Sequence, residues 1–464
     1  MGFKQECESA KVGHTYVQWF YAVLASTTLL TYGMQAGWVS PMTKVLTSEA
    51  SPLGGPLSDS DLSWVGSSMP LTATFCVILY AYIADAFGRK FGVIAIAAPQ
   101  AICWALKLTA TNSTMLTIAR VFGGIAAGGC FNVVPMYIKE ICQDDIRGAV
   151  VSMALLMQNF GILAMYAIGS YLDYHTVIWM VAGIPIVTLV VMMFAPESPA
   201  FLVKREKFEE AAKTAALLRG LEVDDKVVQH EMDVMQNEEK HYANLPKINF
   251  LNIFKNKAWR CGFIYIVVMM TAQAFNGSFT IMTFATTILS GSGVDANPEL
   301  LALIVPVLMI CGSLVSMVCV ERFGRKKLLV GTYLLTSAAM ICLATTQLLR
   351  SLGGSPPSWI PVMAIAAIVW SFAAGVTPMA YVIMSEMFSF QVRSKLIGII
   401  VTYAWLLCSG QLAIFAPISN AFGMHTLFFM FAAVNLFGAV ATLVIIPETK
   451  GKSVEEIEKI LVGK

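Results

Sequence analysis

Residues 85–90 read Asp-Ala-Phe-Gly-Arg-Lys and residues 321–326 read Glu-Arg-Phe-Gly-Arg-Lys, so one charged segment occurs twice, roughly half a chain apart. Two further elements recur in the same order: Glu140 seven residues before Arg147 and Glu386 seven residues before Arg393, then Pro196-Glu197-Ser198 and Pro447-Glu448-Thr449. Each set lies between long apolar runs. The repetition predicts one structural unit that is used twice along the chain.

Hydrophobic residues occupy 57% of the 464 positions and charged residues only 13%. A soluble domain usually carries about 25% charge. The apolar runs are about 20 residues long, enough for a helix to cross a ~30 Å hydrocarbon core, and they are continuous rather than alternating, which argues against strands. We therefore predict an all-α membrane protein with twelve transmembrane helices, near residues 17–41, 62–85, 92–110, 116–138, 149–170, 177–195, 261–289, 299–320, 328–348, 360–385, 396–419 and 424–446.

One long polar stretch, residues 197–260, separates the first six runs from the last six. Apolar residues recur in it at helical spacing, at Phe208, Ala211, Ala212, Ala215 and Leu218. This spacing predicts short amphipathic helices that lie under the membrane, with a disordered linker as the alternative. The chain then divides into an N-terminal six-helix bundle (1–196), a cytoplasmic linker (197–260) and a C-terminal six-helix bundle with a cytoplasmic tail (261–464).

Basic residues are distributed unevenly among the predicted loops. Of the 31 Lys and Arg residues, only Lys44, Lys107 and Arg350 fall in loops that face outward, and this bias places both termini in the cytoplasm. The first apolar run is too long for a cleaved signal segment and indicates a retained span, so we expect a multi-pass protein of the plasma membrane. Asn112-Ser113-Thr114 is a glycosylation sequence in an outer loop, which makes Asn112 a candidate acceptor.

The residue patterns of an enzyme are missing from the sequence. The ten Cys form no Cys-x-x-Cys pair and the five His have no metal-ligand spacing, so we expect no metal and no other cofactor. We find no nucleophile–base constellation and no phosphate-binding loop, and we expect neither enzymatic activity nor a nucleic-acid partner. A duplicated membrane unit is instead typical of secondary transporters, whose solute site lies between the repeats. The expected partners are a small molecule and the lipid bilayer, with the chain acting as a monomer.

The repeated segments and their surroundings resemble the sugar porter family of the major facilitator superfamily. The matching pieces follow the family's order through both halves: Asp85 to Lys90, Arg120 with Pro135 to Glu140, Arg147-Gly148, Pro196 to Pro199, Glu321 to Lys327, Glu386 to Ser389 with Arg393, and Pro447 to Gly451. One such piece is a weak signal, whereas all of them in register are specific. The resemblance implies the major facilitator fold, with two pseudo-symmetric six-helix bundles. Within the family the chain is most similar to insect facilitated trehalose transporters, which Ser63-Trp64-Val65-Gly66 also supports.

The repeated charges have a physical role that can be argued without the family. All lie at predicted cytoplasmic helix ends, where the acids Asp85, Glu140, Glu197, Glu321, Glu386 and Glu448 face the bases Arg89, Lys90, Arg147, Arg325, Lys326 and Arg393. Ion pairs among them can hold the inner sides of the two halves together and break when the halves move apart; the resemblance implies the same role. An exposed pair contributes only about 0–1 kcal/mol, so a network is needed. The alternative is that the bases are topology signals beside solvated carboxylates.

Candidate solute-binding residues come from spans predicted to line a central cavity. In span seven, Gln273, Asn276 and Thr280 are spaced i, i+3, i+7 and share one face, where they can bind solute or, alternatively, bond to neighbouring helices. The remaining candidates are Gln35, Gln158, Phe372, Thr377, Tyr381 and Trp405. Amides suit the hydroxyls of a sugar, and the rings of Tyr381 and Trp405 suit its C–H face, with helix packing or an interfacial position as the alternative for these rings.

Some positions depart from the pattern that the resemblance implies. Where sugar porters usually carry polar residues, this chain has Leu155, Ala274 and Phe279, so we expect a less polar cavity than in typical glucose carriers. Gln35 stands where proton-coupled relatives carry an acid, and no Asp or Glu lies near the middle of a span. We therefore predict facilitative (uniport) transport of a sugar, trehalose or a hexose, by alternating access. The alternatives are a carrier of a less polar, non-sugar solute and a non-transporting nutrient sensor.

Overall fold

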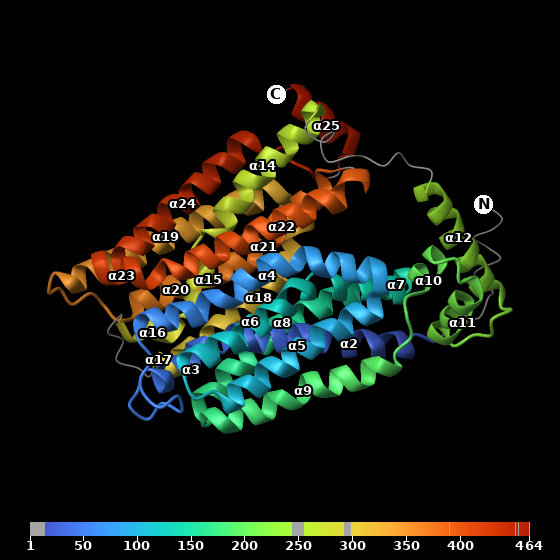
Figure 1. The fold of residues 1–464 in the computed structure, drawn as a ribbon. Coiled ribbons are helices and arrows are strands. Elements are labelled where there is room, and N and C mark those ends of the chain that lie inside the picture. The colour runs from blue at the N-terminus through green and yellow to red at the C-terminus, as the bar shows by residue number, and fades with distance from the viewer. Residues whose placement is uncertain are drawn as a thin grey trace.

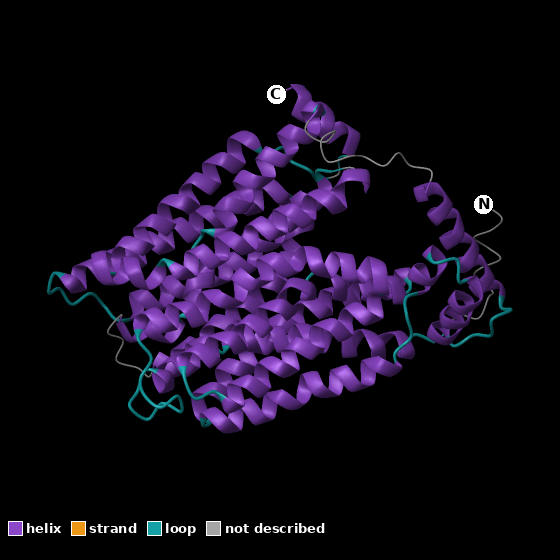
Figure 2. Ribbon diagram, viewed as in Figure 1, coloured by secondary structure: helices purple, strands orange, loops and turns teal. Residues whose placement is uncertain are grey.

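The computed structural model describes residues 14–243, 255–291, 298–388, 390–450, 452 and 454–463, and these residues form helices and loops without a strand (Figure 2). The first half of the chain comprises α2 (Tyr16–Gly37), α3 (Val39–Leu46), α4 (Asp59–Phe87), α5 (Arg89–Thr109), α6 (Ser113–Cys130), α7 (Val133–Ile141), α8 (Asp144–Tyr171) and α9 (Tyr174–Phe194). Three short helices follow, α10 (Pro199–Lys204), α11 (Phe208–Arg219) and α12 (Lys226–Ala243).

The second half has the same order of long helices with more interruptions. It comprises α14 (Lys257–Ala274), α15 (Ser278–Thr283), α16 (Ala285–Gly291), α17 (Pro298–Ala302), α18 (Ile304–Phe323), α19 (Arg325–Ser351), α20 (Trp359–Ser371), the π-helical turn η1 (Phe372–Val376), α21 (Thr377–Glu386), α22 (Phe390–Ala413), α23 (Phe415–Phe422), α24 (Met424–Ile445) and α25 (Val454–Gly463). The predicted all-α fold is confirmed.

Within the described residues, eleven helical stretches are long and apolar enough to cross a membrane, and they overlap the second to twelfth predicted runs. The first predicted run forms α2 and the start of α3 and is not among the eleven. α2 has 22 residues, a spanning length, but includes polar residues such as Gln18, Ser26 and Thr28, which are buried against neighbouring helices. Packing inside the bundle therefore shields the polar groups that lower its hydropathy.

Most long helices pack chiefly on a helix of the same half. In the first half α2 packs on α8, α4 on α6 and α5 on α9, and in the second half α19 packs on α24 (Figure 1). The exception is α22, which packs mainly along α4 of the first half and less on α14. The approach of α2 to α8 depends on two glycines, because a Cβ at Gly33 would lie 2.0 Å from the Gln158 carbonyl oxygen and one at Gly161 would lie 2.0 Å from that of Leu30. Small residues at such crossings allow two backbones to approach closely.

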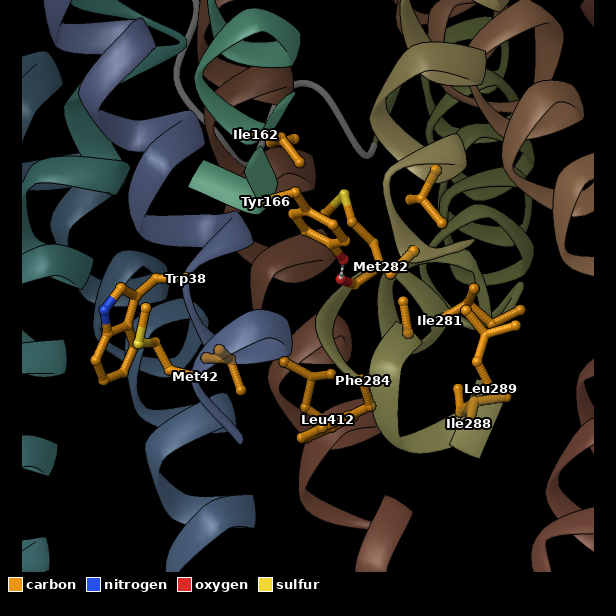
Figure 3. Close-up of a cluster of buried hydrophobic side chains, with 14 of the residues drawn as sticks. Trp38, Met42, Ile162, Tyr166, Ile281, Met282, Phe284, Ile288, Leu289 and Leu412 are labelled. Atoms are coloured by element: carbon orange, nitrogen blue, oxygen red, sulfur yellow. Dashed lines mark hydrogen bonds between the residues drawn. The ribbon is translucent and has the colours of Figure 1, made fainter. Parts of the chain in front are cut away.

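The two ends of the bundle differ in their cores. At the end that holds α3, α16 and α23, here called the apolar end, one hydrophobic core joins both halves and includes Trp38, Met42, Met282 and Phe284 (Figure 3). Toward the opposite end, here called the charged end, two further cores are each built from buried residues of a single half. The halves are thus fused at the apolar end and separately packed toward the charged end.

The segment after α9 forms helices that dock on the first half. Ala211, Ala215 and Leu218 of α11 are buried, as the amphipathic spacing predicts, whereas Phe208 is 45% exposed. The Gln18 amide donates to the Leu218 carbonyl at 3.1 Å, and the Arg219 guanidinium donates to the Ile141 carbonyl at 2.8 Å. Residues 199–243 of the predicted linker are therefore helical and packed, and residues 244–254 lie outside the described structure.

Candidate functional site: two charged clusters and the space between the halves

A first charged cluster lies where α5 begins. The Arg89 Nε is 2.9 Å from a carboxylate oxygen of Glu140, at the end of α7. The backbone N–H groups of Arg89 and Lys90 donate to the Glu197 carboxylate at 2.9 and 3.0 Å, so this acid caps the positive end of the helix. Gly88 precedes the helix with φ of 106°, and a Cβ there would lie 2.2 Å from Glu197 Oε2. Glycine is thus required for the carboxylate to reach the backbone.

The second charged cluster repeats this arrangement where α19 begins. Arg325 Nη2 is 3.1 Å from Glu386 Oε1, at the end of α21. The backbone N–H groups of Arg325 and Lys326 donate to Glu448 at 3.1 and 3.2 Å, and Gly324 before the helix has φ of 85°. Equivalent residues therefore make equivalent contacts in the two halves, which explains why the sequence repeats the acids together with the bases.

Each cluster also contains a hydroxyl to which the sequence analysis gave no role. Ser198 Oγ bonds to Glu140, and Thr449 Oγ1 bonds to Glu386 at 2.5 Å. Both hydroxyls directly follow a capping glutamate, in Pro-Glu-Ser and Pro-Glu-Thr, and that shared position was the signal available in the sequence. Because Glu197 is largely buried, desolvation raises the pKa of its carboxyl, while the three backbone N–H groups of Arg89, Lys90 and Ser198 oppose that rise.

The remaining predicted charges have peripheral positions. Asp85 is 3.3 Å from Lys204 Nζ and 3.7 Å from Arg89 Nη1, and its side chain is largely exposed. Arg147 donates to the carbonyls of Lys139 and Cys142 at 3.0 and 3.3 Å. The Lys326 ammonium donates to the Leu443 carbonyl at 2.8 Å. The side chains of Glu321 and Arg393 lie outside the described structure.

All of these contacts join residues of the same half or of the α10 segment next to it. In this conformation the contacts described above fasten helix ends within each half. Closure of the charged end by these residues stays a prediction about another conformation.

Contacts between the halves gather toward the apolar end. The Thr286 hydroxyl donates to the Ser40 carbonyl at 2.5 Å, and its backbone N–H donates to Ser40 Oγ at 3.2 Å. The Tyr166 hydroxyl donates to the Met282 carbonyl at 2.5 Å (Figure 3). Further bonds between the halves run from Asn420 Nδ2 to Asp59 Oδ2 at 3.1 Å, from Ser409 Oγ to the Ser67 carbonyl at 3.1 Å, and from Asn159 Nδ2 of α8 to Ser313 Oγ of α18 at 3.0 Å. The apolar end is therefore closed.

The three polar candidates of span seven lie at the break between α14 and α15. Gln273 is 8% exposed, whereas Asn276 and Thr280 are buried. The Asn276 carbonyl accepts from Asn435 at 2.9 Å, and its side-chain oxygen accepts from the Ser278 N–H at 2.7 Å. The Gln411 amide donates to the Ala274 carbonyl and accepts from the Gly277 N–H at 3.1 Å and the Thr280 hydroxyl at 3.0 Å. Asn276 and Thr280 thus take part in the helix break, and the solute-binding role of all three residues stays a prediction.

The other solute candidates are spread over both halves. Gln35 is buried, its carbonyl accepts from Arg120 at 2.6 Å, and its side-chain oxygen lies against Gly123, where a Cβ would be 2.6 Å away. Gln158 of α8 and Thr377 of α21 are partly buried. Phe372, in the π-helical turn, packs against two of the cores, and Tyr381 is 39% exposed. Trp405 of α22 contacts Tyr32 and Phe131 of the first half. The solute-binding role of these residues stays a prediction.

Two loop predictions have different outcomes. Lys107 was expected in an outward loop, but it lies in the last turn of α5 and is fully buried, with its ammonium 4.1 Å from the ring centre of Trp38 and 3.9 Å from that of Trp104. Two indole faces attract a cation, and this aromatic site accounts for the burial. Asn112 is exposed in the short loop before α6 and accepts from the Met115 N–H at 2.8 Å.

Known proteins that are similar to this chain over nearly its whole length are transporters. Residues 9–461 match the family described as "Sugar (and other) transporter". Two mosquito facilitated trehalose transporters, of Anopheles gambiae and Culex quinquefasciatus, are 27% and 26% identical over 97% of this chain, which spans 57% and 87% of their lengths. A mouse facilitated glucose transporter, member 6 of solute carrier family 2, is 27% identical over 98% of this chain and 93% of its own.

The fold also matches that of a solved transporter. The xylose transporter XylE from E. coli, in an inward-open conformation, superimposes with a TM-score of 0.76 over 96% of this chain and 99% of the xylose transporter, at 22% identity. At this identity the likeness concerns the fold, which is the predicted major facilitator fold.

Proposed function

Because this chain belongs to the sugar (and other) transporter family, we propose that it is a facilitative carrier that moves a sugar, trehalose or a hexose, across a membrane by alternating access. The eleven candidate spans among the described residues and the major facilitator fold make it a multi-pass membrane protein. Its relatives are transporters, and we expect it to release its solute chemically unchanged.

The observation that carries this proposal is the unequal contact between the halves at the two ends. At the apolar end Thr286 bonds to Ser40 and Tyr166 bonds to Met282, so the halves are joined there. At the charged end Arg89 pairs with Glu140 and Arg325 pairs with Glu386, each within one half. A carrier that opens alternately needs one joined end and one separable end at any time. This conformation supplies both.

The direct test is transport by the purified protein. In liposomes, radiolabelled trehalose, glucose and other mono- and disaccharides are expected to exchange down their gradients with saturable rates. Empty liposomes and liposomes that contain an unrelated membrane protein control for leakage. Absence of saturable exchange across the whole panel would remove sugar from the proposal.

Passive transport is supported by the positions of the acidic residues. Acids of the spanning helices lie near helix ends, as in Asp59 and Asp85 of α4 and Glu386 of α21. In α2 the buried residue at position 35, where proton-coupled relatives are expected to carry an acid, is the uncharged Gln35. A coupled proton needs a titratable group that both sides can reach in turn. Uptake is therefore expected to continue when a protonophore removes the proton gradient at constant solute gradient. Loss of uptake under that condition would contradict passive transport.

A less polar solute is the second candidate, favoured by three apolar residues at the predicted pathway. Leu155 of α8 is 45% exposed, Phe279 of α15 packs against the shared core, and Ala274 is buried beside Gln411. None of the three can donate to or accept from a hydroxyl through its side chain. A larger, less polar glycoside that competes better than glucose would favour this candidate.

The orientation of the chain follows from its charges. We propose that the charged end faces the cytoplasm, that both termini lie on that side, and that the monomer works in the plasma membrane. Asn112 then faces outward in an exposed loop. Glycosidase treatment is expected to shift the electrophoretic mobility of the wild type but not of Asn112→Gln. A protease site added at either terminus is expected to resist cleavage from outside intact cells.

A further inference from the structure

Three aromatic rings meet where the halves face each other. Tyr32 belongs to α2, Phe131 to the break between α6 and α7, and Trp405 to α22. The Tyr32 and Phe131 ring centres are 5.0 Å apart at an interplanar angle of 87°, and the Trp405 ring centre is 6.3 Å from both. Because two rings come from the first half and one from the second, this aromatic cluster bridges the two halves.

The aromatic cluster belongs to the first-half core toward the charged end, where Tyr32 is buried and Phe131 and Trp405 pack against that core. Ser409, one helical turn beyond Trp405, donates to the Ser67 carbonyl of the first half, and Met34 and Trp38, which follow Tyr32 along α2, belong to the shared core. The three rings therefore lie on the charged-end side of the contacts that join the halves at Ser409 and Trp38.

Part of the aromatic cluster is accessible. Tyr32 is 3% exposed, but Phe131 and Trp405 are only partly buried. Trp405 contacts rings of the opposite half, so its ring lies on the side of α22 that faces the first half. Phe131, in contact with the same ring, lies on the side of the first half that faces α22.

Close helix packing fixes the position of Phe131. Just before it, a Cβ at Gly128 would lie 2.7 Å from the Cys76 Cβ of α4, and one at Gly129 would lie 2.7 Å from the Ile96 Cγ1 of α5. The end of α6 therefore lies directly against two neighbours and cannot move back to enlarge the space in front of the ring. Tyr32 packs edge-on against the Phe131 ring and blocks rotation of that ring toward α2.

We propose that Phe131 is a specificity-determining residue of transport, whose ring occupies part of the solute space and sets the largest solute that the carrier accepts. The inference rests on the proposed function and deepens it. The ring and its two neighbours present apolar faces, which suit the C–H face of one pyranose ring. In a disaccharide, the second pyranose ring must then fit in the volume beside Phe131.

The test is a series of variants at one position, measured in proteoliposomes with glucose and trehalose as probes. The readout is the ratio of transport efficiencies, trehalose over glucose. Phe131→Ala removes the whole ring and is expected to raise this ratio at least about tenfold, because a single methylene group in an apolar pocket already changes discrimination by about 10–200-fold. Phe131→Trp is expected to lower the ratio, and Phe131→Leu, which keeps most of the volume, to stay near the wild type.

Phe194→Ala serves as the matched control, because Phe194 is 80% exposed at the end of α9, and it is expected to keep the wild-type ratio. A ratio that is the same in the Ala and Trp variants as in the wild type, with glucose still transported, would overturn the role of Phe131 and leave the proposed function intact. A wild type that transports neither probe would overturn the proposed function, and this inference with it.

Discussion

The contacts at the apolar end join the two halves to each other, whereas those at the charged end join helices within each half. At the apolar end, hydrogen bonds such as Thr286 to Ser40 and a shared hydrophobic core join one half to the other. At the charged end, Arg89 with Glu140 and Arg325 with Glu386 join helix ends inside each half. The difference indicates that the charged clusters keep each half rigid, so that separation at one end is transmitted to the other.

The two charged clusters are alike in their contacts and unequal in their burial. The Arg89 and Glu140 side chains are 10% and 18% exposed, whereas those of Arg325 and Glu386 are 13% and 29% exposed. A charge pair that is better shielded from water depends more on its partner. The first cluster is therefore expected to be the stronger of the two.

The largest predicted effect comes from removing one partner of a cluster. Arg89→Ala leaves Glu140 partly buried without its base, which costs about 3–5 kcal/mol of folding free energy for a buried pair. Arg325→Ala is expected to cost less, because Glu386 is more exposed. Thermal unfolding in detergent checks both values. Lys213→Ala, which removes an exposed pair with Glu209, is the control without a measurable change, and equal stability of all three variants would contradict the ranking.

The next effect concerns solute binding at the helix break. Gln273→Ala is expected to weaken sugar binding by about 1–3 kcal/mol, because an unpaired sugar hydroxyl in a dry site is costly. Thr280→Val is predicted instead to lower stability, since the Thr280 hydroxyl bonds to Gln411. Binding isotherms and melting curves of the two variants separate a solute contact from a structural one. Unchanged affinity in Gln273→Ala would remove this residue from the site.

A smaller effect is expected from weakening the apolar end. Thr286→Val keeps the shape of the side chain but removes the hydroxyl that donates to Ser40, a loss of about 1 kcal/mol. The apolar end should then open more often, and a thiol reagent should label a cysteine placed at Met42, which is buried in the shared core, several-fold faster. Labelling at the wild-type rate would show that this bond does not restrain opening.

The smallest effect is a pH dependence in the first cluster. Burial raises the pKa of the Glu197 carboxyl above 4.5, its ordinary value, so the folded protein holds this proton more tightly than the unfolded chain. The contribution of Glu197 to stability is therefore full below that value and is lost as the pH rises through the raised pKa. Glu197→Gln, which stays neutral, is expected to flatten the stability profile in this interval. A wild type that gains stability relative to the variant as the pH rises through this interval would contradict the assigned sign.

The sequence predicted the helices and the charged clusters because both depend on repeated local patterns. Apolar run length predicted the spans. The duplicated motifs predicted that Arg89, Glu140 and Glu197 lie at the same end of the bundle. The partners inside one half were not predictable, because helix-end charges do not encode which neighbour they meet. Burial of Lys107 between two indoles and the bridge from Phe131 to Trp405 depend on contacts between distant segments, and a single sequence does not carry them.

Alternating access is tested most directly by two distances measured in the same protein. Spin labels on cysteines at Phe87 and Phe323, the equivalent exposed positions at the charged end, report one distance, and labels at Asp59 and Asn420 report the apolar end. Cys311 and Cys342, which are exposed, are replaced by Ser in this background. We predict two populations, in which the charged-end distance shortens whenever the apolar-end distance lengthens, with sugar changing their ratio. Distances that stay single and unchanged with sugar, or that lengthen together, would contradict the account.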